Sequence, residues 1–178
     1  MKNLRCYPLL SGILLNLISA SALAESYNLQ LTGTILSRSC EVDSSSQKQT
    51  VKIGEFSIYD FSSTGSVSRS KPFNIILKDC GSAATGAVLS FTGINDAADP
   101  ALLALSDTGG TGAMASGIAV QILNDTQQPL DLNSASPPTY ALLPGDNTLS
   151  FYLRYKSTKD VVTAGNATAV MYFDLQYQ

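Results

Sequence analysis

The chain has 178 residues, of which 44% are hydrophobic and only 14% are charged. It carries 11 basic and 14 acidic residues and no histidine, so its formal net charge is −3. A net negative charge gives no electrostatic basis for binding nucleic acid or an anionic membrane surface. The absence of histidine excludes Ser-His-Asp and Cys-His nucleophile systems and His-based zinc or copper sites.

Residues 1–24 have the features of a cleaved secretory signal peptide. Lys2 and Arg5 supply a positive start, the apolar run "LLSGILLNLISA" follows, and the segment ends in the small-residue tripeptide "ALA". A short membrane anchor is the alternative, but the run is shorter than the ~18 residues expected of a spanning helix. We therefore expect a mature chain that begins at Glu25 and leaves the cytoplasm. Without Lys2 and Arg5 it has 9 basic residues (11 less 2) against 14 acidic ones, a net charge of about −5.

Residues 25–37 contain a predicted β-strand. Polar residues fall on one parity, and the other parity carries large hydrophobic residues and a glycine: Tyr27, Leu29, Leu31, Gly33 and Ile35. This period of two is typical of a strand with one buried face. From periodicity alone, the strand can pair inside its own domain, as an ordinary first strand, or with another chain.

Two cysteines, Cys40 and Cys80, remain after removal of the signal peptide, because Cys6 leaves with it. In an oxidising compartment a disulfide between them is the expected state. The loop that it closes, about 40 residues, corresponds to roughly 4 kcal/mol of stabilisation in the chain-entropy model. A metal pair is the alternative, but two thiols with no histidine leave a structural zinc site short of ligands.

Most of the remaining sequence alternates between predicted strands and turns. β-Branched, aromatic or alternating hydrophobic residues mark six strands, at residues 49–56, 71–80, 86–93, 117–125, 147–157 and 167–178. Turn-forming segments such as "SSTGSVSRS", "SDTGGTGAM" and "PGDN" separate them. This order predicts one domain, an all-β sandwich of the immunoglobulin type. One helical turn is expected around "DPALLAL", residues 99–105.

Few residues are candidates for catalysis. Asp96 and Asp99 are a possible acid/base or calcium pair, and Gly109, Gly110 and Gly112 resemble part of a phosphate-binding loop. Solvated loop carboxylates and a flexible hairpin connection are the simpler interpretations, since no Lys follows the glycines at the needed spacing. We expect no enzyme activity, no cofactor and no metal.

The last predicted strand has a nearly continuous apolar face. Met171, Phe173, Leu175 and Tyr177 share one parity, and the face extends to the penultimate residue. An exposed apolar edge with unpaired backbone groups is an aggregation hazard, which a sandwich ordinarily covers with a further strand. We expect no residues after this strand to supply that cover.

Together these features resemble the chaperone–usher pilus subunits of Gram-negative bacteria, in particular the minor, tip-adapter subunits of type 1-like fimbriae. The likeness covers essentially the whole mature chain. The shared features are the signal peptide, a glycine in the alternating extension, two cysteines about 40 residues apart, a glycine fourteenth from the end and a penultimate tyrosine: residues 1–24, Gly33, Cys40, Cys80, Gly165 and Tyr177.

The resemblance implies an incomplete immunoglobulin-like β-sandwich, a pilin domain at residues 38–178 that lacks its last strand. In that family a strand donated by another protein completes the fold, which is a form of β-augmentation. Residues 25–37 then act as the donor-strand extension and insert into the groove of the preceding subunit. Leu29 and Leu31 fill pockets there, and Gly33 fits where the groove leaves no room for a side chain.

The resemblance also implies the partners of this groove. Before assembly a periplasmic chaperone lends a strand to it, and an outer-membrane usher receives the complex. The expected chaperone contact is Gln178 with the apolar face of residues 171–177, and Gly165 belongs to the same acceptor strand. In the fibre, neighbouring pilus subunits replace the chaperone.

The predicted function is structural: a subunit, minor or adapter in kind, of an adhesive fimbria on the cell surface, polymerised by donor-strand exchange and contributing to cell adhesion. No nucleic acid and no small-molecule substrate is expected. A glycan-binding tip adhesin is one alternative, although a single domain without Trp leaves little room for a lectin domain. A self-complete secreted β-sandwich that binds a ligand as a monomer is the other. Stable folding of the mature chain alone would favour that monomer.

Overall fold

A computed structural model of the chain describes residues 39–110 and 112–178. The predicted signal peptide and donor-strand extension lie outside these described residues. Two short helical segments are present, α1 (Ser44–Gln47) and η1 (Ile58–Asp60). The strands are β1 (Glu41–Val42), β2 (Lys71–Cys80), β3 (Gly86–Gly93), β4 (Ile118–Leu123), β5 (Pro129–Leu130), β6 (Thr139–Ala141), β7 (Gly145–Ser157) and β8 (Met171–Tyr177).

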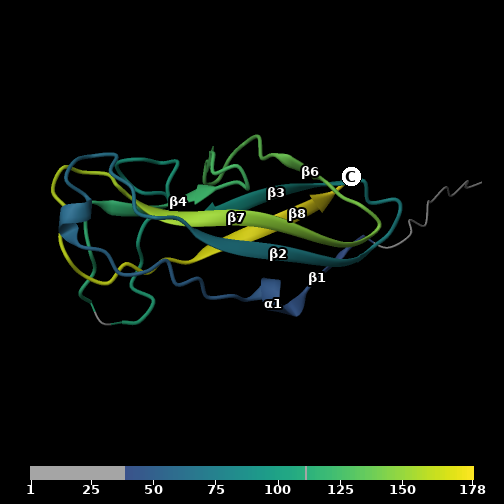
Figure 1. Cartoon of the computed structure of the whole chain (residues 1–178), viewed down its shortest axis with the longest axis horizontal. Helices are drawn as coiled ribbons and strands as arrows, with labels where there is room; N and C mark the ends of the chain where they lie inside the picture. The colour runs from purple at the N-terminus through teal and green to yellow at the C-terminus, as the bar shows by residue number, and fades with distance from the viewer. Residues whose placement is uncertain (1–38, 111) are drawn as a thin grey trace, which may run out of the picture. The chain divides into compact units, whose positions relative to one another are not determined.

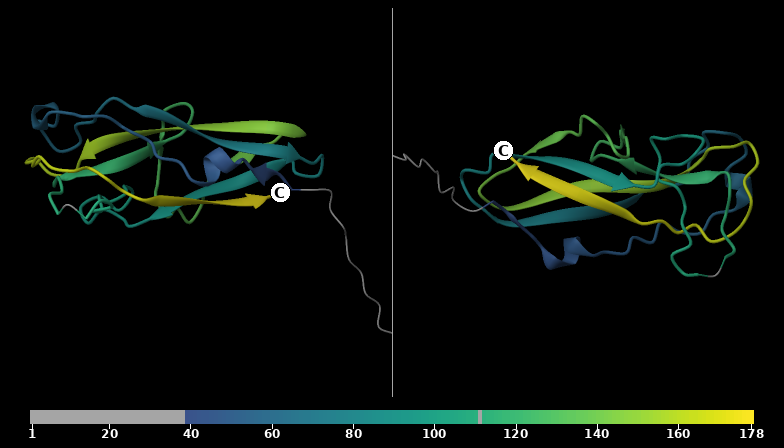
Figure 2. Two further views of the ribbon diagram at one scale, coloured as in Figure 1. Left: turned by 90° about the horizontal axis from the view of Figure 1, so that it is seen from below. Right: turned by 180° about the vertical axis from the view of Figure 1, so that it is seen from behind.

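The strands form two antiparallel sheets packed face to face (Figure 1). One sheet has the order β1-β2-β7-β4-β5, and the other has the order β6-β3-β8. The views in Figure 2 show the two layers and place β8 in the layer opposite β2 and β7. The prediction of an all-β, immunoglobulin-like sandwich is confirmed. No helix in the described part of the chain is long and apolar enough to cross a membrane.

The core lies between the sheets, and Phe151 of β7 is at its centre. Its side chain is fully buried, and its ring centroid lies 5.1 Å from that of Phe91 on β3 and 5.5 Å from those of Phe73 on β2 and Tyr140 on β6. Alternate residues of β7 face inward because successive side chains of a strand point to opposite faces. The period of two in the sequence therefore corresponds to the buried face of the long strands.

Five of the predicted strands are confirmed. Residues 71–80 and 86–93 coincide with β2 and β3, and the segments predicted at 117–125, 147–157 and 167–178 overlap β4, β7 and β8. The disulfide is also confirmed: Cys40 and Cys80 are joined by an S–S bond of 2.02 Å. It ties the chain that enters β1 to the end of β2, where the Asn147 side-chain amide donates to Cys80 Sγ at 3.3 Å.

The predicted strand at residues 49–56 is wrong. The side chains alternate, with Val51 and Ile53 half-buried and Lys52 exposed, but no described strand pairs with this segment. The chain pairs with β2 only over Glu41 and Val42, and α1 then leads it away from the sheet. The segment has the side-chain pattern of a strand without a neighbour to form the ladder.

The turn predicted around residues 99–105 forms as a single hydrogen-bonded turn and is not extended into a helix. In this turn the Leu102 N–H donates to the Asp99 carbonyl at 3.0 Å. Leu103 then exchanges two backbone hydrogen bonds of 2.9 Å with Val120 on β4. Pairing with the sheet edge keeps the chain extended and prevents further helical turns.

Candidate functional site: an apolar groove beside the last strand

The strand β8 is covered on one side only. It pairs with β3 along its whole length, and no described strand pairs with its other edge. Cross-strand neighbours on the inner face show the consequence: Leu89 and Phe91 of β3 are 1% and 3% exposed, whereas their partners Leu175 and Phe173 on β8 remain partly exposed. The apolar face of β8 therefore borders an opening in the core.

Residues 49–56 form the opposite wall of this opening. Val51, Ile53 and Phe56 are half-buried and pack against the same core as Met171, Phe173, Leu175 and Tyr177. In the right-hand view of Figure 2, β8 has β3 on one side and the segment that follows α1 on the other. Two segments far apart in the sequence thus flank one apolar groove, and neither has a strand partner on the side of the groove among the described residues.

A cavity of about 550 Å³ lies at the end of the groove where β8 begins. It is larger and more open than a packing defect and is lined mainly by apolar side chains. Among its lining residues are Phe56, Phe61, Ile118, Tyr155, Val162 and Ala167. The described residues contain no cluster of three His, Cys, Asp or Glu residues that could hold a metal. The apolar lining of the cavity suits an apolar side chain.

Tyr155 connects the floor of the cavity to both of its walls. Its ring packs edge-on against Phe56, with centroids 5.9 Å apart, and its hydroxyl donates a hydrogen bond of 2.6 Å to the Ala167 carbonyl. Burial raises the pKa of the Tyr155 phenol above its usual value of 10, so the group stays protonated and keeps its donor at neutral pH.

Gly165 allows two backbone segments to approach each other at the rim of the cavity. A Cβ at this position would lie 2.4 Å from the backbone nitrogen of Ala115 and the carbonyl carbon of Met114. The segments are joined by backbone hydrogen bonds, in which Asn166 N–H donates to Ala113 at 2.6 Å and Ala115 N–H donates to Asn166 at 2.9 Å. Only glycine fits this approach without a shift of the backbone.

The other end of the groove is closed by Tyr177 and Gln178. The Tyr177 hydroxyl donates to the Cys40 carbonyl at 3.3 Å, which joins the end of β8 to the disulfide. Burial raises the pKa of the Tyr177 phenol and keeps this donor protonated. Gln178 exchanges backbone hydrogen bonds with its neighbours, accepting from Thr85 N–H at 2.9 Å and donating to Gly86 at 2.8 Å.

The predicted acceptor residues Met171, Phe173, Leu175 and Tyr177 lie on β8. Gly165, predicted for the same strand, lies instead in the loop between β7 and β8, where it lines the cavity. The predicted donor residues, Tyr27 to Ile35, lie outside the described residues. Asp96 and Asp99 are structural in their loop: Asp96 accepts from the Ala98 N–H at 2.9 Å, and Asp99 forms a 3.0 Å ion pair with Lys156. The Gly112 N–H donates to Asp107 at 2.7 Å, within a loop.

Sequence reasoning missed the residues of the cavity, chiefly Phe56, Tyr155 and Val162. In the sequence these residues look like ordinary core residues. They come from three distant segments, and only the folded chain brings them to one site. The described residues that line the cavity include one carboxylate, that of Glu55, and no Lys, Arg or His.

Comparisons with known proteins agree with this geometry. The family described as fimbrial protein matches residues 29–178 of this chain. The chain is 46% identical over 166 residues to the uncharacterized fimbrial-like protein YcbU of Escherichia coli, which covers 93% of this chain and 92% of that protein.

Solved structures share the fold. An antigen and type I fimbria protein of Burkholderia pseudomallei superposes with a TM-score of 0.60 at 34% identity, over 78% of this chain and 89% of that one. A chain in the structure of a chaperone–usher pilus superposes with a TM-score of 0.64 at 22% identity, over 90% of this chain and 100% of that one. The family match and the relatives together show that this chain belongs to the fimbrial protein family, as a structural fimbrial subunit and not an enzyme.

Proposed function

We propose that this subunit is polymerised into an adhesive fimbria by donor-strand exchange, in which a strand from one subunit fills the groove beside β8 of the next. The observation that carries the proposal is the one-sided cover of β8. Phe173, Leu175 and Tyr177 are only partly buried, although their partners on β3 (Phe91, Leu89 and Ala87) are buried. A strand placed between β8 and residues 49–56 buries both apolar walls and pairs with both free edges.

In this proposal the predicted donor segment runs antiparallel to β8. Every strand pair in the two sheets is antiparallel, so a strand added in the same manner runs from the Tyr177 end toward the cavity. At about 3.4 Å per residue, residues 27–35 extend over roughly 30 Å. Tyr27 then lies near Tyr177, and Ile35 lies near the cavity. Leu29 and Leu31 face the half-covered core between them.

The energetics support a durable joint. Burial of three or four large side chains contributes roughly 1.5–3 kcal/mol each, and main-chain hydrogen bonds add to this before association costs are subtracted. Because donor segment and acceptor groove are different surfaces, the contact is head to tail. Such contacts extend as open filaments and do not close into rings.

The same groove requires cover before assembly. We propose that a periplasmic chaperone lends a strand to it and contacts Gln178 and the inner face of β8, and that an outer-membrane usher then exchanges this strand for the donor segment of the neighbouring subunit. The proposed route is secretion by the signal peptide, transit through the periplasm and assembly on the cell surface. The fold shared with a chain of a chaperone–usher pilus supports this route.

We further propose that the subunit is a minor or adapter component. A chain with both a donor segment and an acceptor groove takes an internal position, with one neighbour on each side. The resemblance of its motifs to minor subunits of type 1-like fimbriae supports this assignment.

A synthetic peptide of residues 25–37 is expected to bind the chain that lacks these residues and to raise its urea unfolding midpoint. Replacement of both Leu29 and Leu31 by Asp should abolish the effect, because two carboxylates would enter the apolar groove. The matched control replaces Asn28 and Gln30 by Asp, which adds the same charge on the solvent-facing parity. Equal binding by the two variant peptides, measured by calorimetry, would contradict insertion of the segment as a strand.

Substitution Gly165→Ala is expected to displace the backbone at the rim of the cavity, since its Cβ would meet Met114 and Ala115 at 2.4 Å. The strain should cost about 1–3 kcal/mol of unfolding free energy and weaken peptide binding about tenfold. The control Ala98→Ser alters an exposed residue that does not line the cavity. Stability and peptide affinity of Gly165→Ala equal to those of the control would show that the close approach is not required.

Immunogold labelling of purified fimbriae tests the minor or adapter assignment. The proposal predicts a few labels per fibre, confined to one region, because an adapter joins two unlike parts of the fibre. Labelling along the whole fibre would identify the chain as the repeating shaft subunit and would leave donor-strand exchange intact.

A further inference from the structure

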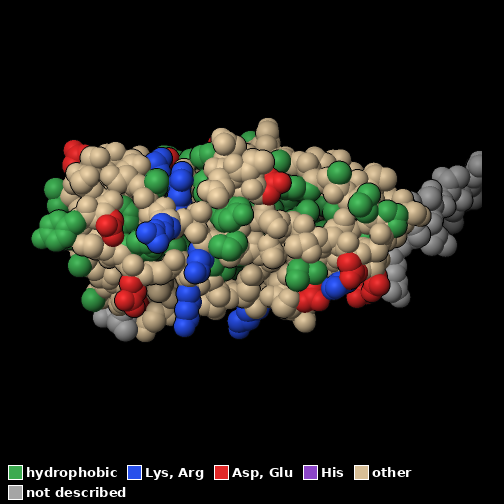
Figure 3. All heavy atoms as spheres, in the orientation of Figure 1, with side chains coloured by type: hydrophobic (Ala, Val, Ile, Leu, Met, Phe, Trp, Pro, Cys, Tyr) green, Lys and Arg blue, Asp and Glu red, His purple; other side chains and the backbone are tan. Residues whose placement is uncertain are grey.

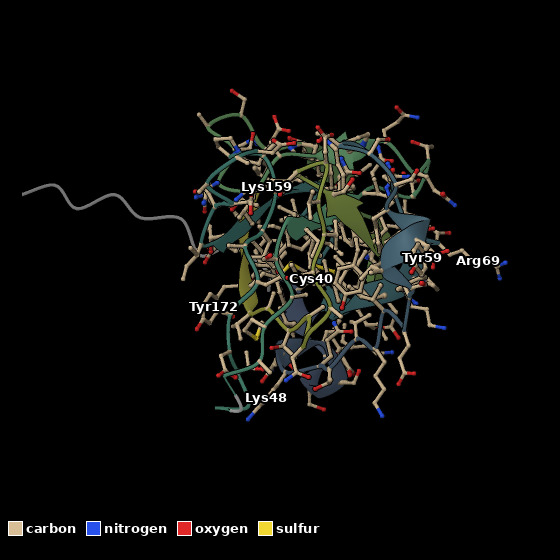
Figure 4. All side chains as sticks on the ribbon, turned by 90° about the vertical axis from the view of Figure 1, so that its left-hand side faces the viewer. Cys40, Lys48, Tyr59, Arg69, Lys159 and Tyr172 are labelled. Atoms are coloured by element: carbon tan, nitrogen blue, oxygen red, sulfur yellow. A yellow bond between two sulfur atoms is a disulfide. The ribbon has the colours of Figure 1, made fainter. Side chains whose placement is uncertain are left out.

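One end of the domain exposes a group of large apolar side chains. Tyr59 is 85% exposed, Val161 is 74% exposed and Ile58 is 41% exposed. Figure 3 shows hydrophobic side chains gathered at this end, where η1 and the loop between β7 and β8 lie in Figure 1. Figure 4, viewed from this end, shows Tyr59 standing out from its turn into solvent. We call Ile58, Tyr59 and Val161 the cavity pole, because Ile58 also lines the cavity.

The exposure of Tyr59 is imposed by a well-anchored turn. The Ser57 hydroxyl accepts from the Tyr59 N–H at 3.3 Å, and the Ser57 N–H donates to the Asp60 carboxylate at 2.9 Å, which closes a capping box around η1. Phe61 directly after the turn is buried. The structure thus holds an aromatic ring away from the core, where it has no partner in its own domain. Tyrosine is among the residues enriched in protein interfaces for this reason.

The loop that carries Val161 is fastened to the same end. The Asp160 carboxylate accepts from the Thr64 backbone N–H at 3.1 Å and from the Thr64 hydroxyl at 2.7 Å. These two bonds hold the pKa of Asp160 below its usual range, so the carboxylate stays ionised at neutral pH. The loop after η1 and the loop after β7 therefore form one surface.

The opposite end of the domain exposes a large aliphatic residue, Leu143, at 72%. Its backbone is fixed by Asn147: the Leu143 N–H donates to the side-chain oxygen at 2.9 Å, and the side-chain amide donates back to the Leu143 carbonyl at 2.7 Å. The same amide reaches Cys80, so Leu143 lies beside the disulfide. In Figure 1 the loop between β6 and β7 lies at the end that holds the C-terminus, away from η1. We call Leu143 and its loop the disulfide pole.

The linker between the donor segment and its domain is short, so it places the disulfide pole of the donating subunit close to the cavity pole of the acceptor. Ile35 and Cys40 are five residues apart, which an extended chain spans with at most about 17 Å. With Ile35 near the cavity of the acceptor, Cys40 of the donating subunit must lie within this distance. The disulfide pole of one subunit then faces the cavity pole of the next.

We propose that the cavity pole is a second contact of the fibre joint, which receives the disulfide pole of the subunit that donates the strand. This inference rests on the proposed donor-strand exchange and adds a contact outside the groove. The partner it fits is a fimbrial subunit with an aliphatic loop beside its disulfide. A second copy of this chain carries that loop as Leu143. The contact restrains the angle between adjacent subunits. Without it, only the short linker between the donor strand and its domain would restrain this angle.

The test compares two ligands of the groove. One is the labelled peptide of residues 25–37, which brings no second domain, and the other is a labelled second copy of the mature chain, residues 25–178. Dissociation rates are measured for the wild-type acceptor and for Tyr59→Ser. The matched control is Tyr172→Ser, since Tyr172 is 68% exposed on the outer face of β8 and points away from the groove.

The Tyr59→Ser acceptor is expected to release the peptide at the wild-type rate and the whole chain about fivefold to thirtyfold faster, the range of an ordinary to a strong interface aromatic. Each variant is normalised to its own peptide rate, so that a change in the groove is separated from a change at the pole. Equal release of the whole chain by Tyr59→Ser and Tyr172→Ser would overturn the contact and leave donor-strand exchange standing. Binding of the peptide but not of the whole chain would also overturn it. Failure of the peptide to bind any acceptor would overturn the proposed function and, with it, the contact.

Discussion

The pairing of β8 with β3 on one side only is the constraint on which the other features of this molecule depend. In a two-layer sandwich, an inward-facing side chain is buried by its own sheet, by the opposite sheet and by the strands on both sides of it. Leu175 and Phe173 have the first two kinds of cover and only one flanking strand, and they remain partly exposed. Residues 49–56 lack a partner in a different way: their side chains alternate as in a strand, but no described strand forms backbone hydrogen bonds with them as a ladder. In the proposed donor-strand exchange, one added strand corrects both deficiencies.

The groove is held open by specific contacts on every side. Tyr155 ties the floor to Phe56 and to Ala167, the disulfide and Tyr177 fasten the far end, and the close approach at Gly165 fixes the rim. These contacts restrain the walls of the groove. Such preorganisation favours tight binding, because the cost of ordering the acceptor is borne in folding and not in association.

The sequence predicts the regular parts of this fold well and the irregular parts poorly. The alternation in β2 and β3 gives their bounds correctly because long strands with one buried face leave a clear period of two. The same signal fails at residues 49–56, since alternation records burial of side chains and not the presence of a pairing partner. The single turn at Asp99 to Leu102 and the short strands β1, β5 and β6 depend on tertiary pairing that no local pattern encodes. Gly165 is marked by its position in the sequence. The physical reason for a glycine there is that the backbone of Met114 and Ala115 passes within reach of a Cβ, which only the three-dimensional structure shows.

The most direct measurement is the urea midpoint of residues 38–178 alone, compared with the same domain carrying residues 25–37 after Gln178 through a short flexible linker. The account predicts a large rise in the midpoint, because the tethered strand fills the groove at a high effective concentration and buries the open face of β8. An unchanged midpoint, in a domain already stable without the strand, would contradict it. The sandwich would then be complete by itself, and the groove beside β8 would not be the place where subunits are joined.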